Sequence, residues 1–211
     1  AIEQVKKAHP AMIFIAEVYN PWEYKHYVEA GFDYLYDKVG MYDTMRGVIC
    51  GNCPTSQITT AWQWVDKISN HMLYFLENHD EQRIASDYFA GDGFRAYPAL
   101  AVNMLMRSNP FMVYAGQEYG ERGMDSEGFS GKDGRTTIFD YWTVPSLHRA
   151  LVAKKSTADE HKLSTMYDRI LSIASTEKAV GEGQFFDLMY VNEHIAQKQY
   201  AFIRKADNEM L

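Results

Sequence analysis

Short apolar runs alternate with amphipathic segments over the first 120 residues of the chain. Four of these runs have the composition of parallel strands buried on both faces, and they predict β-strands at 12–16, 32–36, 72–76 and 111–115. Helical patterns precede them at 1–8, 22–30, 58–69 and 94–107. Regular alternation of helices with short apolar strands predicts a parallel α/β sheet.

Polar residues follow every predicted strand. They are Glu17, Asp37, the cluster Glu-Asn-His-Asp at 77–80, and Gln117 with Glu118. In a (β/α)8 barrel the carboxyl ends of the strands converge on one face, where such residues form the active site. A doubly wound sheet usually carries a glycine-rich phosphate loop, and the sequence contains neither G-x-G-x-x-G nor a Walker motif. The pattern therefore predicts an α/β fold built as a partial (β/α)8 TIM barrel.

The remainder of the chain changes character after Glu118. Residues 119–142 are rich in glycine and charge, 159–175 have a helical pattern, and 184–204 are strand-like. We therefore predict two parts, with residues 1–178 forming half of a barrel and residues 179–211 beginning an all-β domain.

Composition excludes two classes of partner. The chain has 211 residues, a net charge of −7 and a pI near 5.5, whereas a general nucleic-acid binder carries a basic stripe. No apolar run reaches the roughly 18 residues that a membrane helix needs, so we expect no membrane partner. The chain begins inside a helical pattern without an initiator Met, so we expect a piece of a longer protein and assign no compartment.

The two cysteines, Cys50 and Cys53, form a C-x-x-C pair. Such a pair is half a zinc site or a redox dithiol in other settings, but no second pair and no histidine at ligand spacing accompany it. We interpret both as loop thiols without a function.

The polar strand ends suit sugar chemistry. A carboxylic acid protonates a glycosidic oxygen, a second carboxylate stabilises the oxocarbenium-like transition state, and aromatic rings stack on the sugar. Glu17 lies among apolar neighbours, so we expect it to be partly desolvated, as a general acid requires. Plain structural interpretations remain open: a salt-bridged carboxylate for Glu17, a loop-tying imidazole for His79, and core packing for Trp22 and for many of the 15 tyrosines.

Three motifs carry a family resemblance. Phe75–Asp80 (FLENHD) resembles the seventh-strand motif F-V-[DE]-N-H-D of the α-amylase family, glycoside hydrolase family 13, and residues 15–19 (IAEVY) resemble its fifth-strand GEVW motif. Residues 109–120 (NPFMVYAGQEYG) resemble its eighth-strand segment, and 137–142 (TIFDYW) resemble the region that enters its C-terminal β domain. The resemblance implies strands five to eight of the barrel, followed by the beginning of a β-sandwich.

The resemblance also implies residue roles. Glu17 takes the place of the general acid/base, Asp80 that of the transition-state-stabilising Asp, and His79 that of a histidine that hydrogen-bonds the same sugar. Tyr19 and Trp22 follow the acid and would shape the subsites of the leaving group, whereas the acidic residues 77 and 118 would be structural. The implied substrate is an α-1,4-glucan or maltooligosaccharide. The family's calcium ligands lie mainly outside the matching region, so no metal or other cofactor is expected through this chain.

The family's nucleophile, an Asp in a fourth-strand G-[FL]-R-x-D motif, has no counterpart in this sequence. We therefore expect the 211 residues alone to be inactive. We also expect the open sheet edges to pair with an N-terminal barrel half or a second copy. The alternatives are a transglycosylase of the same family (branching, sucrose or trehalose type), a non-catalytic relative such as an amino-acid-transporter heavy chain, and a lectin-like glucan-binding piece.

Overall fold

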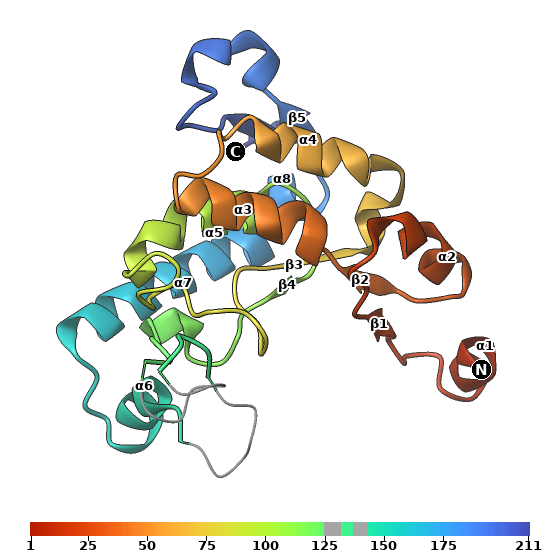
Figure 1. Ribbon diagram of the computed structural model, residues 1–211. Helices are drawn as coiled ribbons and strands as arrows, with labels where there is room; N and C mark the ends of the chain where they lie inside the picture. The colour runs from red at the N-terminus through yellow and green to blue at the C-terminus, as the bar shows by residue number, and fades with distance from the viewer. Residues whose placement is uncertain (125–131, 137–142) are drawn as a thin grey trace.

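The computed structural model describes residues 1–124, 132–136 and 143–211 and contains a parallel sheet in the order β1-β2-β3-β4 (Figure 1). The strands are β1 (Ile15–Ala16), β2 (Tyr34–Tyr36), β3 (Met72–Phe75) and β4 (Phe111–Met112). All three neighbouring pairs are parallel. The predicted parallel α/β arrangement is thus confirmed, while its identity as part of a (β/α)8 barrel stays a prediction.

Burial explains why some strands are shorter than predicted. All four residues of the central strand β3 are buried, whereas the edge strand β1 has one neighbour and leaves Ile15 exposed. Met12 and Ile13 are also exposed and lie outside the paired region. The expectation that residues 12–16 are buried on both faces is therefore wrong, because among the described residues β1 has a neighbouring strand on one side only and Met12, Ile13 and Ile15 remain exposed.

Helices form where the sequence predicted them, with three additions. Their bounds are α1 (Ile2–Ala8), α2 (Tyr24–Glu29), α3 (Asp43–Ile49), α4 (Gln57–Trp64), α5 (Tyr97–Leu105), α6 (Pro145–Leu147), α7 (Ala158–Thr176) and α8 (Lys178–Gly181). Helix α3, with the π-helical turn Lys38–Tyr42 before it, was not predicted, and neither were the short helices α6 and α8. The π-helical turn buries Met41 and Tyr42 and α3 buries Met45, so packing outweighs the low helix propensity of the one glycine in each segment.

Helices α1 and α7 differ in how much of their surface is buried. Helix α1 buries none of its residues and lies at the margin of the molecule in Figure 1. It is tied to the sheet by Lys6, whose ammonium group bonds Asp33 at 2.6 Å and the Gly31 carbonyl at 3.0 Å. Helix α7 instead buries Leu163, Tyr167 and Ile170. Its first turn is closed by a reciprocal capping box between residues 157 and 160.

A second, antiparallel sheet follows, formed by β5 (Gln184–Asp187), β6 (Phe202–Ala206) and β7 (Glu209–Met210). Part of the predicted strand-like region forms 3₁₀ turns instead, at Met189–Val191 and Glu193–Ile195. Asp187 joins this sheet to α4 by accepting hydrogen bonds from Thr59 (2.6 Å) and from Trp62 (2.9 Å). The domain boundary at 178/179 stays a prediction.

None of the helices in the described ranges has the length and apolar character needed to span a membrane. The expected match of residues 137–142 to the family lies outside the described part of the chain.

Candidate active site

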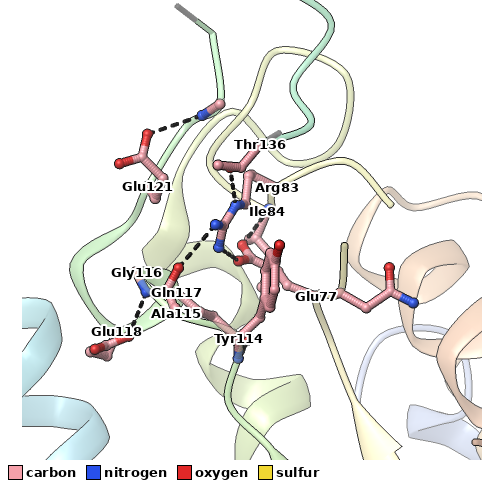
Figure 2. A network of polar contacts seen from close by, with 12 residues as sticks. Glu77, Arg83, Ile84, Tyr114, Ala115, Gly116, Gln117, Glu118, Glu121 and Thr136 are labelled. Carbon is pink, nitrogen blue, oxygen red and sulfur yellow. Dashed lines mark hydrogen bonds and ion pairs between the residues drawn. The ribbon is translucent and has the colours of Figure 1, made fainter. Parts of the chain in front are cut away.

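The end of strand β3 is fixed by a buried ion pair. Glu77 and Arg83 are each 1% exposed, and a guanidinium nitrogen of Arg83 lies 2.8 Å from the Glu77 carboxylate. The same guanidinium donates to the carbonyl of Ala115 at 2.9 Å and to the hydroxyl of Thr136 at 2.7 Å (Figure 2). Glu77 also accepts from the backbone N–H of Ile84 at 2.7 Å. This network holds the loop after β3 against the loop after β4.

Asn78 turns the chain immediately after this ion pair. Its buried side-chain oxygen accepts from the backbone N–H of Asp80 at 3.0 Å and of Glu81 at 2.8 Å. Such an Asx turn uses a side chain in place of a backbone acceptor and fixes a tight bend. His79 and Asp80 then emerge partly exposed, with 37% and 43% of their side chains accessible. The polar strand end is therefore built as a buried support followed by two accessible functional groups.

The four predicted site residues come together from β1 and β3. The hydroxyl of Tyr19 donates to Glu17 Oε1 at 2.6 Å and lies 3.3 Å from Asp80 Oδ2. The Nε2 atom of His79 lies 3.5 Å from Asp80 Oδ2 and 4.0 Å from Glu17 Oε1. Because β1 and β3 flank β2, their carboxyl ends reach the same edge of the sheet, as the barrel pattern requires.

Electrostatics make Tyr19 a neutral donor in this cluster. Burial, and then the hydrogen bond and charge of Glu17, raise the pKa of the Tyr19 phenol well above its usual value. The phenol therefore keeps its proton at any ordinary pH and donates it in hydrogen bonds to the carboxylates of Glu17 and Asp80. Tyr36 and Tyr114 also lie within the field of Asp80, and burial is the largest cause of the raised pKa of both phenols.

Glu17 is less enclosed than expected. Its side chain is 43% exposed, so the desolvation expected from its apolar sequence neighbours is not found. Those neighbours divide between the two faces of the strand, since Ala16 and Val18 are buried and Ile15 is exposed. Sequence adjacency to apolar residues therefore does not bury this carboxyl group.

Glu17, His79 and Asp80 form the one set of three potential metal ligands found within the described residues. Each offers an atom, and these atoms lie within 4.8 Å of one another. Two carboxylates and an imidazole have the oxygen and nitrogen donors that divalent cations accept. The same atoms serve proton transfer equally well, and the arrangement alone does not select a metal.

Other polar strand-end residues point elsewhere. Asp37 is fully buried, and Gln117 is buried with its amide donating to the Tyr167 hydroxyl at 2.9 Å. Glu118 accepts from the backbone N–H of Gly116 at 3.1 Å. Trp22 is 75% exposed, which rules out its interpretation as a core residue in this chain. Position after a strand therefore does not by itself identify a site residue.

The two cysteines lie outside the cluster. Cys50 and Cys53 are both half-buried and not joined by a disulfide, and burial raises the pKa of the Cys53 thiol.

Arg83, which supports the end of strand β3 through its ion pair with Glu77, was not predicted from the sequence. Its signal was present, since an arginine three residues after the motif is within reach of a strand-end glutamate.

Known proteins resemble this chain in both sequence and fold. A family model described as the alpha amylase catalytic domain matches residues 4–180. A search among curated proteins gave no match.

Solved structures resemble the fold of nearly the whole chain. An alpha-amylase from H. orenii has a TM-score of 0.69 at 19% identity, covering 99% of this chain and 44% of its own. A cyclic alpha-maltosyl-(1→6)-maltose hydrolase from Arthrobacter globiformis has a TM-score of 0.67 at 16% identity, covering 98% and 42%. A cyclomaltodextrinase has a TM-score of 0.66 at 16% identity, and the match covers 98% of this chain and 32% of the cyclomaltodextrinase chain. The chain therefore spans less than half the length of these structures. Because the family model matches most of its residues, the chain belongs to the family of alpha-amylase catalytic domains.

Proposed function

We propose that this chain supplies the acid/base side of the active site of a retaining α-glucan hydrolase. The observation that carries the proposal is the meeting of Glu17, Tyr19, His79 and Asp80 at one edge of the sheet. Support for the ligand class comes from similar structures solved with maltose, including AmyP and the A. globiformis hydrolase.

Glu17 is the residue that moves protons in this proposal. Its carboxylic acid donates a proton to the glycosidic oxygen as the bond from that oxygen to the anomeric carbon breaks and the carboxylate nucleophile bonds to the same carbon. The resulting Glu17 carboxylate then accepts a proton from water while the water oxygen bonds to the anomeric carbon and the bond to the nucleophile breaks. The Tyr19 hydroxyl, 2.6 Å from Glu17 Oε1, orients the carboxyl group and stabilises its ionised form.

Asp80 and His79 hold the sugar in this proposal. The Asp80 carboxylate faces the positive charge that develops on the sugar ring, and His79 donates a hydrogen bond to a sugar hydroxyl. The Asx turn of Asn78 fixes the backbone of both residues, so little reorganisation is needed when substrate binds.

The nucleophile is proposed to lie outside this chain. A retaining enzyme places its two carboxyl groups roughly 5–5.5 Å apart. Glu17 and Asp80 offer oxygens within 4.8 Å of each other, so distance alone would allow Asp80 as nucleophile. The family resemblance assigns Asp80 to transition-state stabilisation instead, with the nucleophile on a strand that this sequence lacks. We therefore propose that the 211 residues do not hydrolyse glycosides by themselves.

The partner that completes the site would pair with the open sheet edges. Strands β1 and β4 each have one neighbour, and exposed apolar side chains lie beside β1. An N-terminal barrel half in the same parent protein is the proposed occupant, because it would bring the nucleophile to the same edge of the sheet as Glu17.

Hydrolysis of a nitrophenyl maltoside tests these assignments. We expect the parent gene product to release nitrophenol and the 211-residue chain to release none. In the parent, Glu17→Gln should lower kcat by about 10²–10⁴-fold, the usual contribution of a general acid. Glu118→Gln, at a strand end outside the cluster, is the matched control and should keep its activity. Full activity of the parent Glu17→Gln variant would refute the acid/base assignment, and turnover by the chain alone would show that its nucleophile lies within it.

Transfer to a sugar hydroxyl is the second candidate reaction. A cyclomaltodextrin glucanotransferase is among the similar structures, with a TM-score of 0.63 at 13% identity. The same residues would serve, with a sugar hydroxyl in place of water. Chromatography of maltoheptaose products separates the two, since transfer alone yields chains longer than the substrate.

A further inference from the structure

Two arginines, Arg107 and Arg204, line a cavity of about 400 Å³ where the second sheet meets the segments before β3 and β4. Arg204 belongs to β6, whereas Asn70 and Asn109, which also line the cavity, lie shortly before β3 and β4. The cavity is therefore at the amino ends of these parallel strands, and the candidate active site is at the carboxyl ends of β1 and β3. No residue of the candidate active site lines it.

Arg107 carries donors that the protein leaves unused. Within the described residues its guanidinium makes one hydrogen bond, from Nη2 to Asp66 Oδ1 at 3.0 Å. Its Nε atom is buried and has no hydrogen-bond partner among those residues. A buried donor without an acceptor is costly and rare in native structures, so this N–H indicates a missing acceptor.

Aromatic rings hold the Arg107 guanidinium in place. Its central carbon lies 5.1 Å from the ring centroid of Trp62 and 4.8 Å from that of Phe185. The two rings also contact each other, with centroids 5.3 Å apart. These cation–π contacts fix the position of the cation but supply no oxygen acceptor. The group is thus ordered in advance, and little conformational entropy would be lost when an anion binds.

Arg204 brings a second cation to the same cavity. Its side chain is buried, and all its hydrogen bonds within the described part of the chain go to neutral oxygens, three backbone carbonyls and the Ser108 hydroxyl. Burial, and then the nearby charge of Arg107, lower the pKa of the Arg204 guanidinium. The two cations therefore repel each other, and an anion in the cavity would relieve that repulsion.

The lining is positive although the chain as a whole is negative. Its residues other than the two arginines are neutral, whereas the chain carries a net charge of −7. Asp66 offsets one of the two positive charges from outside the lining, and its own side chain is 57% exposed. One positive charge is left without a carboxylate beside the cavity, which favours an anionic ligand.

Guanidinium geometry selects the kind of anion. The forked N–H donors of arginine match oxyanions, and a phosphate offers more acceptor oxygens than a carboxylate. A nucleic acid is disfavoured by the net charge of −7, which repels a polyanion. We propose that the cavity lined by Arg107 and Arg204 binds a phosphate group, carried by a small sugar ester or free in solution. The amides of Asn70 and Gln184 and the ring of Phe186 extend the lining with groups that suit the sugar of such an ester.

Calorimetric titration of the 211-residue chain with inorganic phosphate, at an ionic strength held constant with sodium chloride, tests the proposal. We expect the wild type to bind and Arg107→Met to weaken binding at least about tenfold, the value of one charge-assisted hydrogen bond. Methionine keeps an apolar contact with the two rings, and circular dichroism checks the fold. Arg122→Met is the matched control, because it removes an arginine from its ion pair with Asp87 outside the cavity and should leave binding unchanged.

A change at Asp66 should act in the opposite direction. Asp66→Asn removes the carboxylate that engages Arg107 Nη2, so phosphate should bind about three- to fivefold more tightly, the value of one partly exposed ion pair. This variant leaves both arginines in place and is therefore independent of any damage that Arg107→Met does to the fold.

A second titration, with glucose 1-phosphate, identifies the source of the phosphate group. Tighter binding of the ester than of inorganic phosphate assigns the site to a sugar ester, and equal or weaker binding assigns it to free phosphate; both agree with the inference. Absence of binding of either compound by the wild type would overturn it. Equal affinities of the wild type and a folded Arg107→Met variant would do the same. If Arg107→Met does not fold, unchanged or weaker binding by Asp66→Asn overturns the inference instead.

Discussion

Replacing Asp37 by Asn is expected to stabilise the chain at neutral pH but not at pH 4. Asp37 follows strand β2 and is completely buried. Its Oδ1 atom accepts from the backbone N–H of Gly40 at 3.2 Å and lies 3.5 Å from the Tyr24 hydroxyl. Its Oδ2 atom is also buried and has no hydrogen-bond partner within the described part of the chain. An ionised carboxylate in this position is poorly solvated.

The magnitude follows from the shift in pKa. Burial raises the pKa of Asp37 from 3.8 to about 6, against the opposing hydrogen bonds from Met41, Gly40 and Tyr24. The folded chain therefore holds the proton more tightly than the unfolded chain, and the stability this provides is complete below pH 3.8 and lost as pH rises through 6. At about 1.4 kcal/mol per pKa unit, ionisation at pH 7 costs the fold about 3 kcal/mol. Asn avoids this cost and keeps an oxygen for the Gly40 N–H.

Urea unfolding followed by circular dichroism at pH 4, 5, 6 and 7 measures the effect. The free energy of unfolding of Asp37→Asn minus that of the wild type should increase by about 2.5 kcal/mol from pH 4 to pH 7, because a small part of the cost is already present at pH 4. Asp33→Asn is the matched control with opposite sign, because the Lys6 hydrogen bond lowers the pKa of Asp33. The lowered pKa means that ionised Asp33 stabilises the fold at pH values above the pKa of the unfolded chain, and this stabilisation is lost as pH falls through the folded pKa. The Asp33→Asn variant should therefore be less stable than the wild type at pH 7, and the difference should shrink as pH falls. A pH-independent difference for Asp37→Asn would refute the reasoning.

Three further predictions concern the neighbouring polar groups. Arg83→Met should lower the free energy of unfolding by about 3–5 kcal/mol in urea at pH 7, because it leaves the Glu77 carboxylate buried without its cation, and an effect below about 1 kcal/mol would contradict this. Gly40→Ala should lower the thermal midpoint, because the new Cβ would clash with Asp37 Oδ1; an unchanged midpoint would show that the turn adapts. In the parent protein, Tyr19→Phe should lower kcat/KM for a nitrophenyl maltoside by about 10–100-fold, the value of one hydrogen bond to a charged group, and wild-type kinetics would remove Tyr19 from the site.

Periodicity predicted the order of the elements because each apolar run is short and each is bounded by polar or turn residues. The four strands form in the predicted order, and the helix predicted at 159–175 forms as Ala158–Thr176. Helix α3 was missed because a glycine interrupts it and another interrupts the turn before it, and its stability comes from contacts with the core that periodicity does not report.

The composition of a strand did not reveal its burial. The run at 12–16 is as apolar as the run at 72–76, yet Ile13 is exposed and Met72 is completely buried. The difference comes from the number of neighbouring strands and helices, which depends on chain segments far away in sequence. Similarly, motifs placed Glu17 and Asp80 at strand ends, but the hydrogen bonds of Tyr19 that join them could be known only from the packed sheet.

Burial divides the acidic residues at the strand ends into two kinds. Asp37 and Glu77 are buried and hold backbone in place, Asp37 at the turn after β2 and Glu77 through Ile84 and the Arg83 ion pair. Glu17 and Asp80 are accessible, and their ionisable oxygens face one another rather than structural donors. A proton-transfer group must exchange protons with substrate and water, so enclosure of the first kind excludes that role. The four carboxylates look alike in sequence, and accessibility at a shared edge is the property that supports the proposal of Glu17 and Asp80, rather than the two buried residues, as site residues.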